Sequence, residues 1–591
     1  NEISLSGASI VESDSLTVTM TLVDEVRRAQ AVQSSATSGG DGTALLLDLL
    51  TGALKDIAQN THVQHDGLTL VETADTIPPE IVKGAFLTLG DGRLIIQASE
   101  TILNTSVSFN GMRVTNNTGE GSISLDGASL VPSIGSTVNF TVQLTELQRV
   151  SVIAISGTPG GDGSSTTLDI DPNQVTDVAL NPNIAGASVV IHEDPDVIIP
   201  TFVSAAINLS TGVLKVLFSE TIDMTPISLV NTSKFSISNF SDSQFVNLVG
   251  SIASGGDLPT VTITLTEPQR VSAIEMSSQP GGDGIAQFIS ATFGAVQDIS
   301  TNSLGTGNNV TLSEIPDTVI PQLVAAAIDL GTKTVFITLS ETIDNTPASL
   351  VSPSKISILN ATSLNGNTLS GGTITETDGL NITIAISEAQ RAAALYKSKT
   401  PGGDYSGTVL RVIPDAFQDI GQVRNGLNES VTITEIADSV PPTLASGSIS
   451  LSYGHLTIVA SETMELSPFS VEKFDISRFH LSNAIGLQNT SLNGSTVIYT
   501  NQDSTQVVVE LTEAQRVSAI QMSSTSGGDG TPLVLEAADN SFTDIGQLKN
   551  AESTNTVLSE SADTIKPSIT NATLSYGLGT LVLLASETIL L

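Results

Sequence analysis

Cysteine and tryptophan are absent from this sequence, and aromatic residues make up only 4% of its 591 positions. Without cysteine the chain has no disulfide framework and no thiolate metal site. Basic residues are scarce, since 22 Lys and Arg stand against 61 Asp and Glu, and the net charge is -39. Nucleic acid and anionic membrane surfaces are therefore poor partners, whereas cations are favourable ones.

Long apolar runs and a recurring histidine are also missing. No stretch reaches about 18 apolar residues without a polar interruption, so we expect no membrane-spanning segment. The five histidines occupy no fixed position in the repeat described below, so no copy offers a convincing Ser/His/Asp arrangement and we expect no enzyme. His62 and His65, followed by Asp66, have the spacing of metal ligands, but a solvated loop is the favoured interpretation.

What the sequence has instead is one module copied in tandem. A Gly-Gly-Asp cluster recurs with spacings of 121, 121, 121 and 125 residues. A fixed period of domain size indicates a repeated structural unit. The clusters are Gly39-Gly40-Asp41, Gly160-Gly161-Asp162, Gly281-Gly282-Asp283, Gly402-Gly403-Asp404 and Gly527-Gly528-Asp529.

Further landmarks keep the same period. They are a Ser-Glu-Thr triplet that ends an apolar run, a Glu/Gln/Arg cluster, an Asp-Ile or Asp-Val pair, and the pattern Glu-x-x-Asp-x-x-x-Pro. Each complete copy, of about 121 residues, is long enough to bury its own core. The predicted domains are 1–75 (the C-terminal part of a module), 76–196, 197–317, 318–438, 439–563 and 564–591 (the N-terminal part of a module).

The residues within a copy predict an all-β fold. In the copy at 197–317, alternating runs such as Val261–Leu265 and Phe235–Ser238 are separated by Gly, Asn, Asp and Ser. Such runs predict tandem Ig-like antiparallel β-sandwiches. The first strand pair should turn at a glycine, because a tight turn requires positive φ. The expected turn residues are Gly92, Gly212, Gly331, Gly454 and Gly579.

A short helical turn is expected in each sandwich. Thr266 and Gln269 have the spacing of a capping box, and the other copies repeat it at Thr145/Gln148, Ser387/Gln390 and Thr512/Gln515. Val150 and Ile153 should then face the core. The proline-containing joints between copies are only a few residues long, so we expect the modules to form a stiff rod.

The order of these motifs resembles bacterial Ig-like repeats. The residues that carry the resemblance are Phe218–Ile222, Ser233–Ile237 and Asp298-Ile299 with Asn302, followed by a proline-started copy. The closest likeness is to repeats of giant cell-surface proteins involved in cyanobacterial swimming and of large adhesins. The resemblance implies an Ig-like sandwich and a structural or adhesive role outside the cell. Mastigonemes, the hairs of algal flagella, and surface layers are the alternative assemblies that the resemblance implies. The Glu-x-Gln-Arg turn and the Gly-Gly-Asp-Gly cluster depart from the generic pattern.

Acidic residues at the joints suggest calcium, because hard cations prefer clustered carboxylate oxygens. Cadherin-like modules hold calcium in such places, and Glu220 and Asp283 could reach the same end of the sandwich. Turn capping and a solvated face are the alternative explanation. The candidate ligands are Glu193, Asp196, Glu314, Asp317, Glu435 and Asp438.

An arginine also recurs at each helix although basic residues are rare. We interpret it as half of a structural ion pair with acids of the joint or of the Ser-Glu-Thr segment, while a binding role is the alternative. These arginines are Arg149, Arg270, Arg391 and Arg516.

Asn-x-Ser/Thr sequons are frequent, and we find no module period among them. They fit a secreted glycoprotein, although a chain rich in Ser and Thr forms many by chance. The sequons are Asn104, Asn116, Asn139, Asn208, Asn231, Asn239, Asn309, Asn360, Asn381, Asn428, Asn489, Asn493 and Asn571.

These observations predict a structural protein that forms a stiff extracellular rod or filament at the cell surface and associates with copies of itself. The two partial modules suggest a window of a longer repetitive chain, close to one five-module unit, or completion by a neighbouring chain. Glycans are further candidate partners. The alternative is the stalk of a large adhesin whose ligand-binding tip lies elsewhere.

Overall fold

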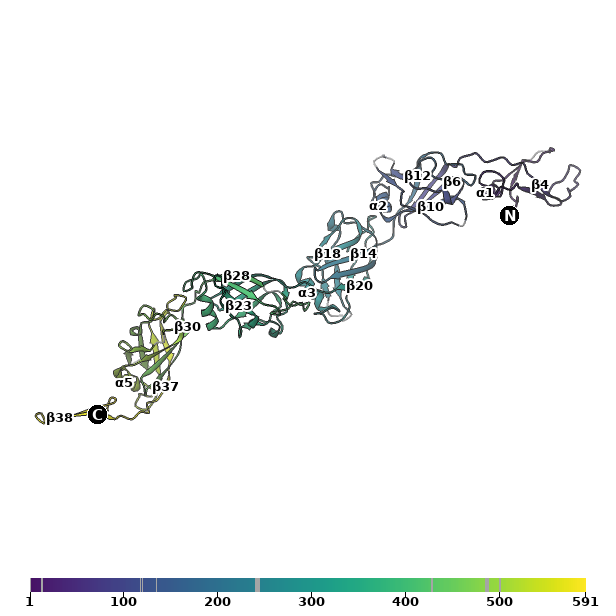
Figure 1. Ribbon diagram of the computed structural model, residues 1–591. Coiled ribbons are helices and arrows are strands. Elements are labelled where there is room, and N and C mark those ends of the chain that lie inside the picture. Colours follow the sequence, from purple (N-terminus) through teal and green to yellow (C-terminus); the bar gives the residue numbers. More distant parts are fainter. Residues whose placement is uncertain are drawn as a thin grey trace. The chain divides into compact units, whose positions relative to one another are not determined.

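A computed structural model describes residues 2–590 apart from 12–13, 117, 119–120, 134, 240–244, 427–428, 484–487 and 499–500. The chain forms two compact units, residues 1–316 and 317–591, which are treated separately below. Each unit contains two complete β-sandwiches and one smaller segment (Figure 1). The fold is all-β with tandem Ig-like sandwiches, as the sequence predicts.

The first unit begins with a small segment and continues with sandwich 1 (81–194) and sandwich 2 (202–315). The segment contains β1 (Ser9–Ile10), β2 (Met20–Thr21), α1 (Glu25–Gln33), β3 (Leu46–Leu49) and β4 (His65–Thr69). Sandwich 1 contains β5 (Ile81–Thr88), β6 (Arg93–Ile102), β7 (Met112–Asn116), β8 (Ser122–Ser124), β9 (Ser129–Leu130), β10 (Thr137–Gln143), α2 (Glu146–Ala154), β11 (Thr166–Ile170) and β12 (Gly186–Asp194). Sandwich 2 contains β13 (Phe202–Asn208), β14 (Val213–Ile222), β15 (Phe235–Ser238), β16 (Phe245–Asn247), β17 (Ile252–Ser254), β18 (Leu258–Thr264), α3 (Glu267–Glu275), β19 (Phe288–Ala291) and β20 (Asn308–Ile315).

The second unit contains sandwich 3 (323–436), sandwich 4 (444–561) and a final hairpin of β38 (Ile569–Ser575) and β39 (Thr580–Ala585). Sandwich 3 contains β21 (Leu323–Asp329), β22 (Thr334–Ile343), β23 (Ile356–Asn360), β24 (Gly366–Thr368), β25 (Thr373–Ile374), β26 (Gly379–Ala385), α4 (Glu388–Leu395), β27 (Thr408–Val412) and β28 (Glu429–Ile436). Sandwich 4 contains β29 (Leu444–Ser450), β30 (His455–Met464), β31 (Phe479–Asn483), β32 (Asn489–Ser491), β33 (Thr496–Ile498), β34 (Ser504–Glu510), α5 (Glu513–Gln521), β35 (Leu533–Ala537), β36 (Ser553–Val557) and β37 (Ser559–Ser561). Short 3-10 turns span Asn104–Ser106, Ile227–Leu229, Thr232–Lys234, Ala348–Leu350, Pro353–Lys355 and Ile476–Arg478.

One long strand links the two layers of a sandwich. In sandwich 1 the sheet order is β8-β7-β11-β12-β5-β6-β10-β9, and β12 pairs with β11 through its first half and with β5 through its second half. Sandwiches 2 and 3 repeat this order, whereas in sandwich 4 the linking strand is divided into β36 and β37. The predicted domain boundaries fall between these sheets, and the division into domains itself stays a prediction.

One strand pair in each sandwich runs parallel, whereas the other pairs are antiparallel as the sequence predicts. β12 runs parallel to β5, with Ile191 opposite Ala85, and the same pairing joins β20 to β13 and β28 to β21. The linking strand arrives from the other layer after a long connection, so it enters the sheet in the same direction as the first strand. The linking strand thereby forms backbone hydrogen bonds with one strand of each layer.

Alternation along the strands forms the core. Leu94, Ile96 and Ala98 of β6 are buried while their neighbours are more exposed, and they pack with residues of the opposite layer such as Val114 and Leu168. This is the period of two that places every second side chain on one face. Among the described residues, no helix is long and apolar enough to cross a membrane.

The predicted turn glycines are confirmed except one. Gly92, Gly212, Gly454 and Gly579 have φ between 65° and 68°. Gly331 has no positive φ, and Lys333 occupies the left-handed position of that turn with φ 61°. A residue other than glycine is uncommon in this region, and Lys333 Nζ also forms an ion pair with Glu388 at 2.9 Å.

Candidate metal centres at the joints

The helix of each copy is held at its first turn by its own sandwich. The capping boxes predicted for α2, α3, α4 and α5 are all present. In α2, Gln148 also donates from Nε2 to the carbonyl oxygens of Ser124 (2.9 Å) and Asp126 (2.8 Å). The buried apolar face is Val152 and Ile153, whereas Val150, which was expected to face the core, is only half-buried.

This anchored helix directs Arg149 into the joint between sandwiches 1 and 2. The side chain is 6% exposed and pairs with Glu146 of its own helix at 2.8 Å. Its Nη1 donates to Asp196 Oδ2 at 2.6 Å and to the carbonyl oxygen of Leu89 at 3.1 Å, and its Nη2 to Glu220 Oε2 at 3.2 Å. The guanidinium therefore connects its own sandwich, the linker and the next sandwich.

The second unit repeats this arrangement. Arg391 pairs with Asp438 at 2.5 Å and Glu462 at 3.2 Å, and Arg516 pairs with Asp563 at 2.8 Å and Glu587 at 3.0 Å. Each also pairs with the glutamate at the start of its helix, as Arg270 does with Glu267 at 2.7 Å. The prediction of a structural ion pair with acids of the joint and of the Ser-Glu-Thr segment is confirmed for Arg149, Arg391 and Arg516.

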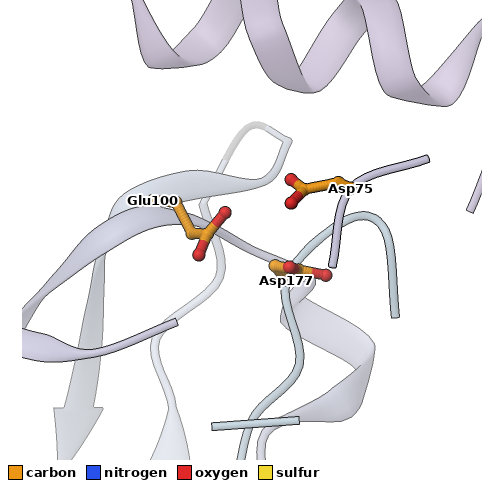
Figure 2. Close-up of side chains that lie close together, drawn as sticks. All are labelled: Asp75, Glu100 and Asp177. Carbon is orange, nitrogen blue, oxygen red and sulfur yellow. The ribbon is translucent and has the colours of Figure 1, made fainter. Parts of the chain in front are cut away.

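Three carboxylates meet beside each of four joints in the described part of the chain. Asp196 of the linker, Glu220 of the Ser-Glu-Thr segment and Asp298 of the Asp-Ile segment each offer an oxygen, and these oxygens lie within 4.8 Å of one another. Figure 2 shows the corresponding group before sandwich 1, in which Glu100 and Asp75 direct their carboxylates toward each other with Asp177 beside them. We call these groups acid triads. The four acid triads are Asp75/Glu100/Asp177, Asp196/Glu220/Asp298, Asp317/Glu341/Asp419 and Asp438/Glu462/Asp544.

Local structure places each member of an acid triad. The alternation along β14 breaks at its end, where Glu220, Thr221 and Ile222 are buried in succession. A bridge from Ile222 to Asp298 places Asp298, the third acid of the triad, beside Glu220. Asn302 donates from Nδ2 to Asp298 Oδ2 (2.9 Å) and to the carbonyl oxygen of Asp196 (3.1 Å). One asparagine thus ties the third acid to the linker.

Two of the triad glutamates, Glu100 and Glu220, are buried with one oxygen unsatisfied. Glu100 is 7% exposed and Glu220 is 6% exposed, and among the residues that the structure describes Oε1 of each has no hydrogen-bond partner. Burial, and next the charges of Asp177 and Asp75, raise the pKa of Glu100 to about 7. Burial, and next the charges of Asp298 and Asp196, raise the pKa of Glu220 to about 8. Burial and the neighbouring aspartates therefore disfavour the charged form of both glutamates.

The structure separates the aspartate and the glutamate of each predicted joint pair. Asp196 lies in an acid triad, but Glu193 accepts bonds from Gly157 N (3.1 Å) and Thr166 N (2.8 Å) of its own sandwich. Side chains alternate along β12, and Glu193 faces the loop after α2 rather than the linker. The same holds for Glu314, which accepts from Ser278 N and Gln287 N, and for Glu435, which accepts from Lys399 N and Thr408 Oγ1; their partners Asp317 and Asp438 lie in acid triads.

Sequence reasoning recognised the remaining triad positions only in part. Glu220 was expected near the joint, and the structure places it there, whereas Asp283 caps a turn and accepts from Asn239 Nδ2 at 2.6 Å. Asp298 and its copies appeared only as a landmark. The available signal was that both acids keep the module period and that the first of them ends an apolar strand.

The Gly-Gly-Asp cluster explains how closely the backbones of neighbouring modules approach each other at the joints. A Cβ at Gly160 would overlap the carbonyl oxygen of Ile299, the residue after Asp298, and its φ is +87°. Gly39 stands in the same relation to Val178, and Gly402 to Ile545. Only glycine combines this φ with this contact. Ile299 packs against the core of sandwich 1, so the next sandwich is seated in its neighbour.

His62 and His65 form no acid or metal cluster with Asp66 in the part of the chain that the structure describes. Nδ1 of His62 accepts a long bond from Leu54 N (3.5 Å), His65 is exposed in β4, and Asp66 accepts from Gln64 Nε2 (2.9 Å). The arrangement fits a loop beside a strand.

Three sequons are inaccessible in the folded chain. Asn116, Asn239 and Asn360 are buried, and their side-chain amides donate to the aspartates of the Gly-Gly-Asp clusters at 3.0, 2.6 and 2.7 Å. These three occupy equivalent positions, so the statement that no sequon keeps the period is wrong for them. Asn104 and Asn208 are half-buried. The exposed sequons are Asn139, Asn231, Asn309, Asn381, Asn489, Asn493 and Asn571, and Asn428 lies outside the described residues.

Comparisons with known proteins give no family. No protein-family model and no curated protein matches the chain. Solved structures with some likeness include the N-terminal part of the bacterial S-layer protein SbsC (15% identity, 32% of this chain and 44% of that one, TM-score 0.14). The N-terminal eight Ig domains of Down Syndrome Cell Adhesion Molecule (11% identity, 83% and 58%, TM-score 0.15) and rSbsC(31-844) (10%, 86% and 63%, TM-score 0.15) are others. The chain spans less than two thirds of each of these three. At such scores the likeness carries no argument about function.

Proposed function

We propose that this chain is a structural repeat protein that forms a stiff extracellular rod or filament at a cell surface and associates with copies of itself. The proposal assigns no catalytic reaction to the chain. The observation that supports it most strongly is the second joint, where one buried guanidinium bridges sandwich 1, the linker and sandwich 2.

Further contacts support stiffness at that joint. Thr221 N donates to Glu146 Oε1 at 2.9 Å, and the carbonyl oxygen of Ile299 lies directly over Gly160. Only residues 195–201 separate β12 from β13, and they include two prolines. A short linker with prolines and buried contacts on both sides restricts bending far more than a Gly/Ser linker does.

The experiment is small-angle X-ray scattering and negative-stain imaging of the full chain at several concentrations. We expect rods whose length reflects four sandwiches placed end to end, on the order of 160 Å at roughly 40 Å each. Self-association should appear as scattering mass that rises with concentration. A broad distribution of bent, bead-like particles would contradict stiffness.

The adhesin stalk is the competing function, since the resemblance of the motifs extends to large adhesins. It differs in one observable, because a stalk stays a single rod at every concentration and needs a separate tip to bind glycans or cells. Rods of the expected length with constant mass would favour the stalk over the filament.

A further inference from the structure

We propose that each acid triad binds one Ca²⁺ ion, with carboxylate oxygens of the linker aspartate, the Ser-Glu-Thr glutamate and the Asp-Ile aspartate as ligands. This inference concerns the joints themselves and does not rest on the chain's being a filament or a stalk.

The donor set selects the class of cation. All three side chains of an acid triad are carboxylates, and the chain contains no cysteine and only five histidines, none of which belongs to these groups. Oxygen-only sites favour hard cations over zinc or copper. The oxygens lie within 4.8 Å of one another, about the span of two Ca²⁺–oxygen bonds of roughly 2.4 Å, whereas Mg²⁺ needs a tighter cage.

An unsatisfied buried oxygen distinguishes these groups from ordinary surface acids. Glu100 and Glu220 are more than nine-tenths buried, and Oε1 of each lacks a hydrogen-bond donor. Figure 2 shows the Glu100 carboxylate directed into its acid triad. Asp544 of the fourth acid triad is fully buried, and its Oδ2 also lacks a hydrogen-bond donor among the described residues. Native proteins rarely leave such atoms without a partner, and a cation would satisfy them.

The arginine of the joint leaves the proposed ligand free. At the second joint, Arg149 contacts Asp196 Oδ2 and Glu220 Oε2, while Glu220 Oε1 has no partner. Arg149 supplies one positive charge beside four carboxylates, those of Glu146 and of the three acids of the triad. Negative charge therefore remains in excess. Repetition strengthens the inference, because four groups arise from equivalent positions in different copies.

The test measures Ca²⁺ bound to the full chain after its ions are removed with a chelator. Equilibrium dialysis should give four ions per chain, and saturating Ca²⁺ at about a hundredfold excess over Kd should raise the melting temperature by roughly 10 °C. Glu220→Gln should bind three ions, because it keeps the size and removes the charge of one ligand. Asp544→Asn should also bind three, which gives a second reading in the other unit.

Asp194→Asn is the matched control. It removes the same charge two residues from Asp196, but its side chain is exposed and lies in no acid triad, so four ions should remain. In each variant the remaining sites report that the chain is folded. The proposal is overturned if the unaltered chain binds no Ca²⁺ saturably, or if both ligand variants and the control bind the same number of ions. Such a result would leave the rod measurement unaffected.

Discussion

The first and second joints of the first unit contain the same acid triad but differ in the cation beside it. At the second joint Arg149 is 6% exposed and bridges Glu146, Asp196 and Glu220. At the first joint the equivalent residue is Arg28, whose side chain is 42% exposed and forms an ion pair only with Glu25 among the described residues. The acid triad of the first joint is nevertheless assembled (Figure 2).

The difference begins at the third residue of the helix. α2 has Gln148 there, which completes the capping box and ties the helix to two carbonyl oxygens of its sandwich. α1 has Arg27, which pairs with Asp24 at 3.4 Å, and Asp24 caps Val26 N instead. The comparison teaches that the acid triad does not need the arginine bridge, whereas the bridge depends on how the helix is anchored.

The largest effect should come from removing the bridge. Arg149→Met leaves two buried carboxylates without their partner, so we expect a loss of about 3–5 kcal/mol at the second joint. Arg28→Met should cost at most about 1 kcal/mol, because an exposed pair contributes little. Thermal unfolding of both variants would compare the two losses, and hydrogen exchange at the amide of Thr221, which bonds Glu146, would report the opening of the second joint. Equal losses in the two variants would remove the distinction.

Backbone contact should be alike in both joints. Gly160→Ala places a Cβ against Ile299 O, and Gly39→Ala places one against Val178 O, so both should destabilise their joint by clearly more than 2 kcal/mol. Gly163→Ala is the control, since its φ is +85° but nothing lies within 4 Å, and it should cost only about 1–2 kcal/mol. Thermal unfolding of the three variants measures this. A Gly160→Ala chain as stable as the control would refute the close contact.

The two joints should also differ in calcium affinity, and here the first joint should have the higher value. Among the described residues no arginine forms an ion pair with the acid triad of the first joint, so we expect it to bind Ca²⁺ roughly tenfold more tightly, or by about 1.4 kcal/mol, than the second. Titration calorimetry of Glu100→Gln and Glu220→Gln would show which class of site each variant removes. If Glu100→Gln lost the weaker class of Ca²⁺ site, the result would contradict the assignment of the tighter site to the first joint.

The smallest effect should come from the third residue of the helix, which anchors the helix to its sandwich in α2. Arg27→Gln supplies the glutamine that α1 lacks, and we expect a gain of about 0.5 kcal/mol together with greater burial of Arg28. The reverse change, Gln148→Arg, should weaken α2 and loosen Arg149. Protection of the first-turn amides in hydrogen exchange measures both. No change in protection in either variant would mean that the third helical position does not control the arginine.

Much of this architecture could be predicted from local patterns. Alternation marked β15 at Phe235–Ser238, Thr145 and Gln148 marked the start of α2, and the recurring arginines indicated ion pairs at the joints. Such features depend on neighbours three or four residues apart, or on a period that survives in every copy. Gly331 shows the limit, because the left-handed position is taken by Lys333, a residue that the glycine rule does not consider.

By itself, the sequence determined the period, the all-β class, the helix caps and the chemistry available at the joints, because each is written in residue spacing and composition. Only the tertiary structure decided which acids meet. Glu193 and Asp196 are close in sequence but face different neighbours, since Glu193 lies on β12 and bonds its own sandwich, whereas Asp196 lies in the linker after that strand. Asp196, Glu220 and Asp298 come from a linker, a strand end and a loop. Their meeting depends on one sandwich being seated on the next, which is a long-range packing property and leaves no local pattern.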